Sequence, residues 1–339
     1  MKKLIAIYLV LITFHSGIVA QTNDFYDDAP QNDLRTSPIT IAGEVENPGV
    51  VDFSTLPVRQ VVVKETEYNN ENGKFTGAYQ YEGYSLYDIL DKIVLKKKNQ
   101  EEFPPIIDLY VEVESASGEK VVLSWGEVYY PIHRHEIIIA AKVRRIVPSK
   151  TKDLWPLPVD AKLVVASDLY TERNISNPVK ITVKSSTVKY RIDRDIKDMY
   201  ADDVKFYHKN NLLNTLTEKT LPGLPMVNYG SVFYGRGRGI HGTTPFKGFM
   251  LKDFTRELYK MNQETLRTGL ILVAAPDGYR AVFSYSEIFN RNDQAEVLIV
   301  PMPAVKDQGA YLLYPAADFF SDRSIRCLNE VRFLQITDM

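Results

Sequence analysis

Apolar and polar positions follow regular periods along the chain, and these periods predict its strands and turns. Segment 109–113 alternates between apolar and polar residues, as a half-buried strand does. The apolar runs 137–139 and 297–299 are typical of central strands. Segments 116–118 and 276–278 each end in glycine, which tolerates the positive φ of a tight hairpin turn. The pattern predicts strand, turn, strand, short helix and strand, in that order.

A helical period stands out in segment 81–93, which begins with an aromatic residue, a glycine and a second aromatic residue. Its apolar positions with helical spacing are Leu86, Ile89, Leu90 and Ile93. Ser85 directly precedes them and is the residue type that caps helix N-termini. We therefore predict a short amphipathic helix that begins after Ser85.

Three blocks of the chain occur twice and in the same order. The pairs are 81–93 with 246–258, 111–139 with 271–299, and 162–175 with 312–325, at offsets of 165, 160 and 150 residues. A repeat of this length is that of a domain rather than of a solenoid. The blocks indicate an internal duplication, with repeat A at 38–186 and repeat B at 187–339. Segment 188–230 shows no visible match to 39–80.

The first 20 residues have the pattern of a secretory signal peptide. Lys2 and Lys3 precede the apolar run 4–14, and the small residue Ala20 offers a cleavage site. The run is too short to cross a bilayer, and no later stretch is apolar enough to do so. We predict a periplasmic or secreted protein without a membrane span in its mature chain. Residues 21–37 are polar and are predicted to form a flexible lead-in.

Composition narrows the class of protein further. Hydrophobic residues make up 45% and charged residues 25% of the chain, which is typical of a globular protein. The net charge of −2 gives no electrostatic reason to expect nucleic-acid binding. Cys327 is the only cysteine, so an intramolecular disulfide is excluded.

Several of these motifs resemble one known family. Segments 43–57, 81–90 and 277–284 are similar to fold markers of the oxidoreductase molybdopterin-binding domain of the sulfite-oxidase type. The resemblance implies an α+β fold of two tandem mixed α/β domains, with mainly antiparallel strands and few helices. We expect no bound cofactor, and molybdopterin is the one cofactor that the resemblance makes possible.

The cysteine on which the chemistry of that family depends is absent. The resemblance implies that a metal-ligating cysteine should lie in segment 59–80, which contains none, and Cys327 lies elsewhere. This departure argues against oxygen-atom transfer. The leading hypothesis is an exported, non-catalytic binding or assembly protein, with a small anionic ligand or an envelope protein as its partner. The alternatives are a molybdopterin-dependent oxidoreductase without a thiolate ligand and a glycan- or peptide-binding surface protein.

The most unusual segment is rich in glycine and arginine. Its candidate cofactor-binding residues are Gly235, Arg236, Gly237, Arg238, Gly239 and His241. Glycines let backbone N–H groups converge on an anion, and guanidinium groups bind phosphate with two hydrogen bonds. The segment is predicted to bind a pterin phosphate or another anion; a solvated surface loop is the alternative.

Two further sets of residues have possible chemistry. His133 and His135, followed by Glu136, have a spacing that allows metal binding on one face of a strand, or they form a polar surface connection. Tyr68, Tyr79, Tyr81 and Tyr84 cluster in a polar stretch. These tyrosines suit either glycan or peptide binding or, more simply, strand packing.

A carboxylate and an arginine five residues apart recur in both repeats. The pairs are Asp168 with Arg173 and Asp318 with Arg323. Such a pair forms an ion pair that fixes a turn, or leaves its arginine free to recognise a ligand. Recurrence in both repeats favours the structural role.

Overall fold

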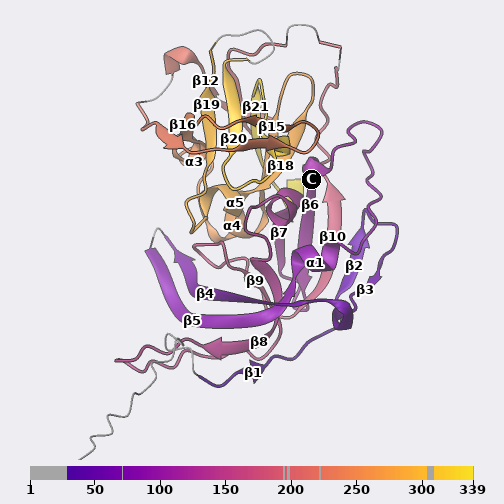
Figure 1. Cartoon of the computed structure of the whole chain (residues 1–339), viewed down its shortest axis with the longest axis vertical. Helices are drawn as coiled ribbons and strands as arrows, with labels where there is room; N and C mark the ends of the chain where they lie inside the picture. The colour runs from indigo at the N-terminus through magenta and orange to yellow at the C-terminus, as the bar shows by residue number, and fades with distance from the viewer. Residues whose placement is uncertain are drawn as a thin grey trace, which may run out of the picture.

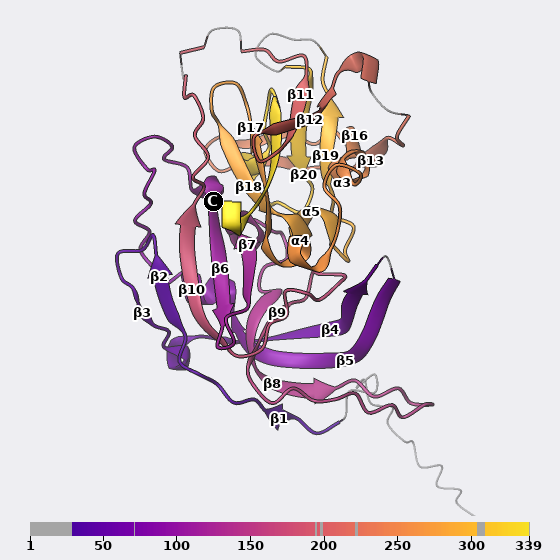
Figure 2. The ribbon, with the colours of Figure 1, turned by 180° about the vertical axis from the view of Figure 1, so that it is seen from behind.

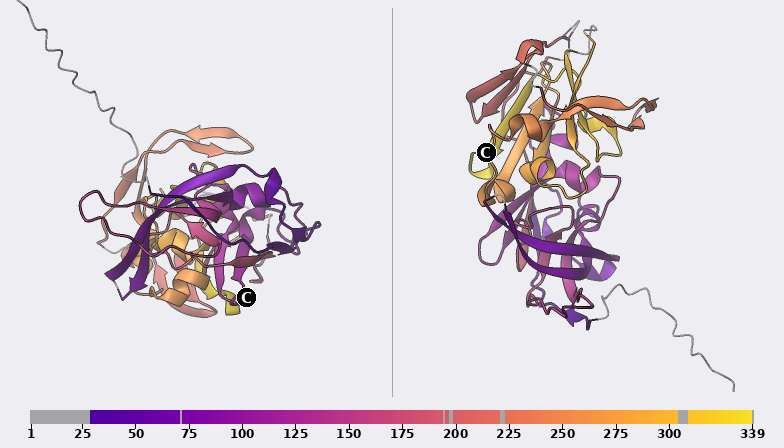
Figure 3. Two further views of the ribbon diagram at one scale, coloured as in Figure 1. Left: turned by 90° about the horizontal axis from the view of Figure 1, so that it is seen from below. Right: turned by 90° about the vertical axis from the view of Figure 1, so that its left-hand side faces the viewer.

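The computed structural model describes residues 29–70, 72–193, 195–196, 199–220, 223–303 and 309–338. The predicted signal peptide, 1–20, and the first part of the lead-in lie outside the described residues. The half of the chain that begins with residue 29 lies at one end of the molecule and the second half at the other (Figure 1). Figure 2 and Figure 3 show the same arrangement from other sides.

Strands make up 43% of the structure and helices 14%, in four small sheets arranged in a ring like that of a four-bladed propeller. The predicted α+β fold of two tandem mixed α/β domains of the sulfite-oxidase type is therefore wrong. The similar motifs are turns and short blocks, and such local features do not determine how sheets are arranged in space. The helices are also short, with little more than one turn each.

Two sheets come from the first half of the chain. The first consists of β1 (Asn32–Asp33), β8 (Ile137–Arg145), β5 (Asn72–Ser85) and β4 (Val58–Asn69), with β9 (Lys162–Val165) paired to β8. The second has the order β3 (Gly49–Val50), β2 (Thr40–Gly43), β10 (Pro178–Ser185), β6 (Leu109–Ser115) and β7 (Lys120–Ser124). Within the predicted flexible lead-in, β1 pairs with β8 and Leu34 is buried, so residues 32–34 pack on the first sheet.

The second half contributes two further sheets and a ribbon. One sheet has the order β12 (Asn211–Leu216), β11 (Val204–His208), β21 (Glu330–Gln335), β17 (Gly269–Ala274) and β18 (Arg280–Ser284). The other has the order β13 (Val227–Tyr229), β16 (Phe246–Met250), β19 (Val297–Pro301) and β20 (Tyr311–Pro315). The strands β14 (Phe233–Gly235) and β15 (Gly239–Gly242) pair with each other as a separate two-stranded ribbon.

The strand order of the second half repeats that of the first. β11 runs parallel to β21 as β2 runs parallel to β10, and each sheet continues through an antiparallel pair, β6–β7 or β17–β18. The strands β11, β12 and β13 fall in segment 188–230, where the sequence shows no match between the halves. The two halves thus share the same strand pairing even in a segment where their sequences show no match. The predicted boundary at 186/187 lies in the connection between β10 and β11.

The helices are short and several are capped by side chains. They are α1 (Leu86–Leu90), α2 (Trp125–Tyr129), α3 (Leu251–Thr255), α4 (Gln263–Thr268) and α5 (Tyr285–Phe289). Short 3-10 turns are η1 (Phe53–Thr55), η2 (Ile106–Asp108), η3 (Glu218–Thr220), η4 (Ser321–Arg323) and η5 (Ile336–Asp338). Ser85 accepts a hydrogen bond from the Tyr87 N–H, which confirms the predicted cap of α1. Gly118 and Gly278 have φ of +85° and +82°, as the predicted hairpin turns require.

The two halves share an apolar interface. Tyr110 and Val122 of the first half pack with Leu270 and Leu272 of the second. Tyr110 lies on the face of β6 that alternation predicts to be half exposed, yet only 2% of its surface is exposed. That prediction is wrong because the second half covers this face of the strand.

Candidate functional site

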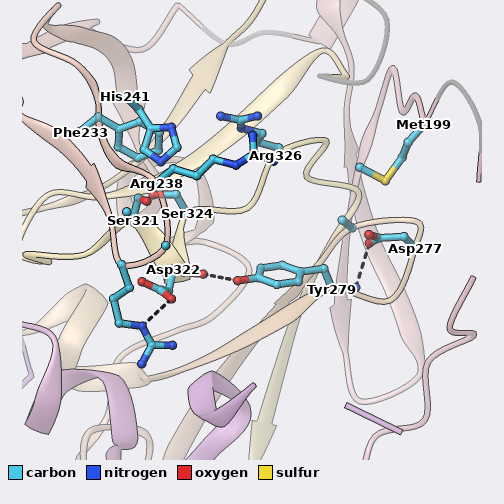
Figure 4. Close-up of a pocket in the computed structure, with 14 residues that line it drawn as sticks. Met199, Phe233, Arg238, His241, Asp277, Tyr279, Ser321, Asp322, Ser324 and Arg326 are labelled. Carbon is cyan, nitrogen blue, oxygen red and sulfur yellow. Dashed lines mark hydrogen bonds and ion pairs between the residues drawn. The ribbon is translucent and has the colours of Figure 1, made fainter. Parts of the chain in front are cut away.

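A pocket with a volume of about 700 Å³ lies in the second half. Four segments form its walls: the β14–β15 ribbon, the turn between β17 and β18, the loop that contains η4, and Met199 in the connection between β10 and β11 (Figure 4). The volume lies within the range of about 300–1,000 Å³ that is usual for small-molecule sites.

The β14–β15 ribbon turns one face toward the pocket. Its alternation directs Phe233, Gly235 and His241 to the pocket wall and leaves Tyr234 and Ile240 exposed. A Cβ atom on Gly235 would lie 2.5 Å from Nε2 of His241, so a larger residue at this position would clash with the imidazole ring. The His241 ring also lies 5.5 Å from the Phe233 ring, measured between centroids.

The pocket wall is rich in guanidinium groups. Arg236 donates from Nε to Oδ1 of Asp322 at 3.0 Å and remains half exposed. Arg238 and Arg326 also line the pocket and are exposed to solvent. Neither forms an ion pair within the described residues. Two arginines from separate segments therefore present free guanidinium groups to one pocket, which attracts anions.

Polar groups on the remaining walls have hydrogen-bonding capacity to spare. Tyr279 donates from its hydroxyl to the Asp322 carbonyl at 2.7 Å, and its backbone N–H donates to Oδ1 of Asp277 at 2.9 Å. Burial, reinforced by Asp322, raises the pKa of Tyr279, so the phenol stays protonated. Within the described residues, Oδ2 of Asp322 and Oγ of Ser324 are buried without a hydrogen-bond partner. Buried polar atoms of this kind are usually paired with water or ligand.

The structure brings most of the predicted anion loop to this pocket. Gly235, Arg236, Gly237, Arg238 and His241 line it. Gly239 does not, but its φ of +72° provides the turn of the ribbon. That these residues bind an anion stays a prediction.

Other lining residues were missed from the sequence. Asp277 and Tyr279 belong to a motif interpreted only as a turn, and Ser321, Asp322, Ser324 and Arg326 flank an arginine interpreted as structural. The proximity of Arg326 to a conspicuous motif, three residues beyond Arg323, is the one local signal that could have indicated it.

The histidine candidates occupy a different and much smaller cavity, of about 20 Å³, which holds about one water molecule. His133, His135 and Glu136 all line it, but Nδ1 of His135 lies 3.1 Å from Oγ of Ser85. Burial, followed by the charge of Arg59, lowers the pKa of His135. Among the described residues, no group of three or more His, Cys, Asp or Glu side chains is placed to hold a metal ion.

The two recurring Asp–Arg motifs form buried ion pairs, as predicted. Arg173 donates two hydrogen bonds to Asp168, at 2.7 and 2.8 Å, and Arg323 donates two to Asp318, at 2.6 and 2.8 Å. Both arginines are 1% exposed. They are therefore inaccessible to a ligand, and the alternative of ligand recognition is disfavoured.

These ion pairs also join the two halves. Arg173 donates to Glu127 in its own half and to Oγ of Ser284 in the other, both at 3.0 Å. Arg323 donates correspondingly to Glu287, at 2.5 Å, and to Oγ of Ser124, at 3.2 Å. Burial raises the pKa of Glu127 to about 7, and repulsion by nearby carboxylates adds to this rise. The positive charge of Arg173 opposes it.

Cys327 and the tyrosine cluster have structural positions. Cys327 is fully buried, and burial raises the pKa of its thiol to about 11, so it is a poor nucleophile. Tyr79 and Tyr81 are buried in the first sheet, as strand packing predicts. Segment 59–80 forms most of the β4–β5 hairpin. The expectation of no bound cofactor, with molybdopterin as the possible one, stays a prediction.

Comparison with protein-family models finds no match, and comparison with curated proteins finds none either. Within the described residues, no helix combines the length and the apolar character needed to cross a membrane. The site must therefore be interpreted from its own geometry.

Proposed function

We propose that the protein is an exported, non-catalytic binding protein that holds a small organic anion in the pocket beside the β14–β15 ribbon. One observation carries the proposal: Arg238 and Arg326, from separate segments, line a pocket of about 700 Å³ without a carboxylate partner among the described residues. Like charges that converge on one cavity repel each other, and an anion between them relieves that repulsion.

The surrounding groups support binding rather than a structural role for this charge. Arg236 forms an ion pair with Asp322, and the structural arginines Arg173 and Arg323 are likewise paired with carboxylates. The two arginines that carry the proposal differ from these three, because neither has such a pair within the described residues. His241 and Ser321 add hydrogen-bonding groups on the same wall. The pocket thus has the donors that a carboxylate or phosphate needs.

The test is thermal unfolding of the mature chain with phosphate, sulfate, glucuronate and glucose 6-phosphate, at constant ionic strength. At least one anion should stabilise the wild type, by about 2.7 kcal/mol at a hundredfold excess over its Kd. The double variant Arg238→Ala/Arg326→Ala should lose this effect and keep its own stability. Arg256→Ala, at the C-cap of α3 and outside the pocket, is the control for loss of an exposed arginine. Equal stabilisation of the wild type and the double variant would contradict the proposal.

A further inference from the structure

We infer that the anion is a hydroxylated one, an acidic sugar such as a uronate or a sugar phosphate. This inference rests on the proposed function and concerns the same pocket. Its basis is a division of charge across the walls. Figure 4 shows Arg238, His241 and Arg326 in one part of the pocket and Asp322, Tyr279 and Asp277 in another.

The carboxylates of the pocket call for hydrogen-bond donors from a ligand. Asp277 accepts the Tyr279 N–H at one oxygen and forms no ion pair within the described residues. Asp322 uses one oxygen for Arg236, and its other oxygen is buried without a hydrogen-bond partner within the described residues. A bare carboxylate such as acetate offers only acceptors to these groups and is repelled by them. Hydroxyl groups on the anion would instead donate to them, which removes the penalty of unpaired acceptors.

Apolar groups complete the requirement. The rings of Phe233 and Tyr279, with Met199 and Ala275, line the same pocket. A sugar ring has C–H groups on its faces and hydroxyls around its edge, so it can contact an apolar wall while its edge forms hydrogen bonds. The acid group at one end of such a ring would pair with Arg238 and Arg326.

Selectivity over other anions is the expected consequence. Acetate satisfies the guanidinium groups but offers no donor to the remaining oxygens of Asp277 and Asp322, and inorganic phosphate offers at most two. Neutral glucose satisfies the carboxylates but leaves the two arginines unpaired. Only a ligand with both kinds of group satisfies both parts of the pocket.

The experiment is isothermal titration calorimetry of the mature chain with five probes: glucuronate, glucose 6-phosphate, glucose, acetate and phosphate. At least one acidic sugar should bind tenfold or more tightly than glucose, acetate and phosphate, since each satisfied hydrogen bond contributes about 1 kcal/mol. Asp277→Asn should weaken acidic-sugar binding about tenfold, as a charged acceptor forms the stronger hydrogen bond. It should not weaken acetate binding. Asparagine keeps the oxygen that accepts the Tyr279 N–H, and Asp253→Asn on α3 is the control.

The outcomes separate the two proposals. If acetate or phosphate binds as tightly as the acidic sugars, or if Asp277→Asn leaves the acidic-sugar affinity unchanged, the hydroxylated-anion inference is overturned and the anion pocket stands. If none of the anions binds, or glucose binds as tightly as glucuronate, the proposed function itself fails.

Discussion

The pocket of the second half has a counterpart in the first half that is closed. Thr171 and Glu172 correspond to Ser321 and Asp322 in the aligned repeats. There the β4–β5 hairpin docks directly on them: the Thr66 N–H donates to Oγ1 of Thr171 at 3.0 Å, and the Tyr68 N–H donates to Glu172 at 2.8 Å. In the first half the β4–β5 hairpin therefore packs directly on the loop that contains Thr171 and Glu172. In the second half a pocket separates the β14–β15 ribbon from the corresponding loop.

Helix α4 accounts for much of the difference. Its Arg267 forms ion pairs with Glu119 and Glu172 of the first half, each at 3.3 Å. The first half has no helix in the corresponding interval; it presents Phe103, whose ring faces Tyr279 at 5.8 Å. Arg267 of the second half is thus paired with two carboxylates of the first half, whereas Arg238 and Arg326, also of the second half, form no ion pair within the described residues. The comparison separates structural charge from charge that is available to a ligand.

The largest effect should come from the buried ion pairs that both halves share. Arg173→Ala and Arg323→Ala should each lower the free energy of unfolding by about 3–5 kcal/mol, because each leaves carboxylates buried without a partner. The measurement is urea denaturation followed by circular dichroism. Similar losses are expected, since the two networks have the same partners. A loss below 1 kcal/mol in either variant would show that its network is not structural.

The pH dependence of stability should reveal the same network. Burial raises the folded-state pKa of Glu127 to about 7 from an ordinary value of 4.5, so its contribution is fully present below pH 4.5 and is lost as pH rises through 7. The loss is about 3.5 kcal/mol, because the shift from 4.5 to about 7 spans about 2.5 pKa units at about 1.4 kcal/mol each. Urea denaturation between pH 4.5 and 8 measures it. Glu127→Gln should flatten this part of the profile; an unchanged slope in that variant would assign the titration to another group.

A smaller effect is expected where the halves differ. Arg267→Ala should lower the free energy of unfolding by about 1 kcal/mol, because its partly exposed ion pairs contribute modestly. It should also free Glu119 and Glu172, which cannot attract an anion. Calorimetry of this variant should therefore show no additional anion site in the first half, and a second equivalent of bound anion would refute that expectation.

The smallest effect concerns the turn of the ribbon. Gly239→Ala should cost about 1 kcal/mol, because φ of +72° is unfavourable for a residue with a Cβ atom. Gly237→Ala is the matched control in the same turn, where a Cβ atom would meet nothing within 4 Å. Thermal unfolding of the two variants measures the difference, and equal stability would mean that the turn adapts to either residue.

Local features of this fold could be predicted from the sequence. Ser85 was recognised as a cap and Gly118 and Gly278 as turn residues, because each acts on neighbouring backbone. Asp318 and Arg323 were recognised as a pair because the motif recurs and its partners are five residues apart. These predictions depend on short-range geometry that residue type and spacing determine.

Features set by distant segments could not be predicted. Burial of Tyr110 depends on the second half, and the arrangement of the sheets depends on contacts that no local motif specifies. The sequence predicted only some residues of the anion pocket. Arg236 and Arg238 stand out because they lie in a segment rich in glycine and arginine. Arg326 and Asp277 lie far from that segment in the chain, and only the folded structure brings them to the same pocket. A site built from four segments leaves only part of its pattern in any one of them.

The stoichiometry of anion binding tests the central claim most directly. Titration calorimetry of the wild type and of Arg238→Ala/Arg326→Ala, with glucuronate or glucose 6-phosphate, measures it. We predict one equivalent of bound anion per wild-type chain and none for the double variant, because Arg238 and Arg326 line the pocket without an ion pair within the described residues. Two equivalents, or one equivalent that persists in the double variant, would contradict this account.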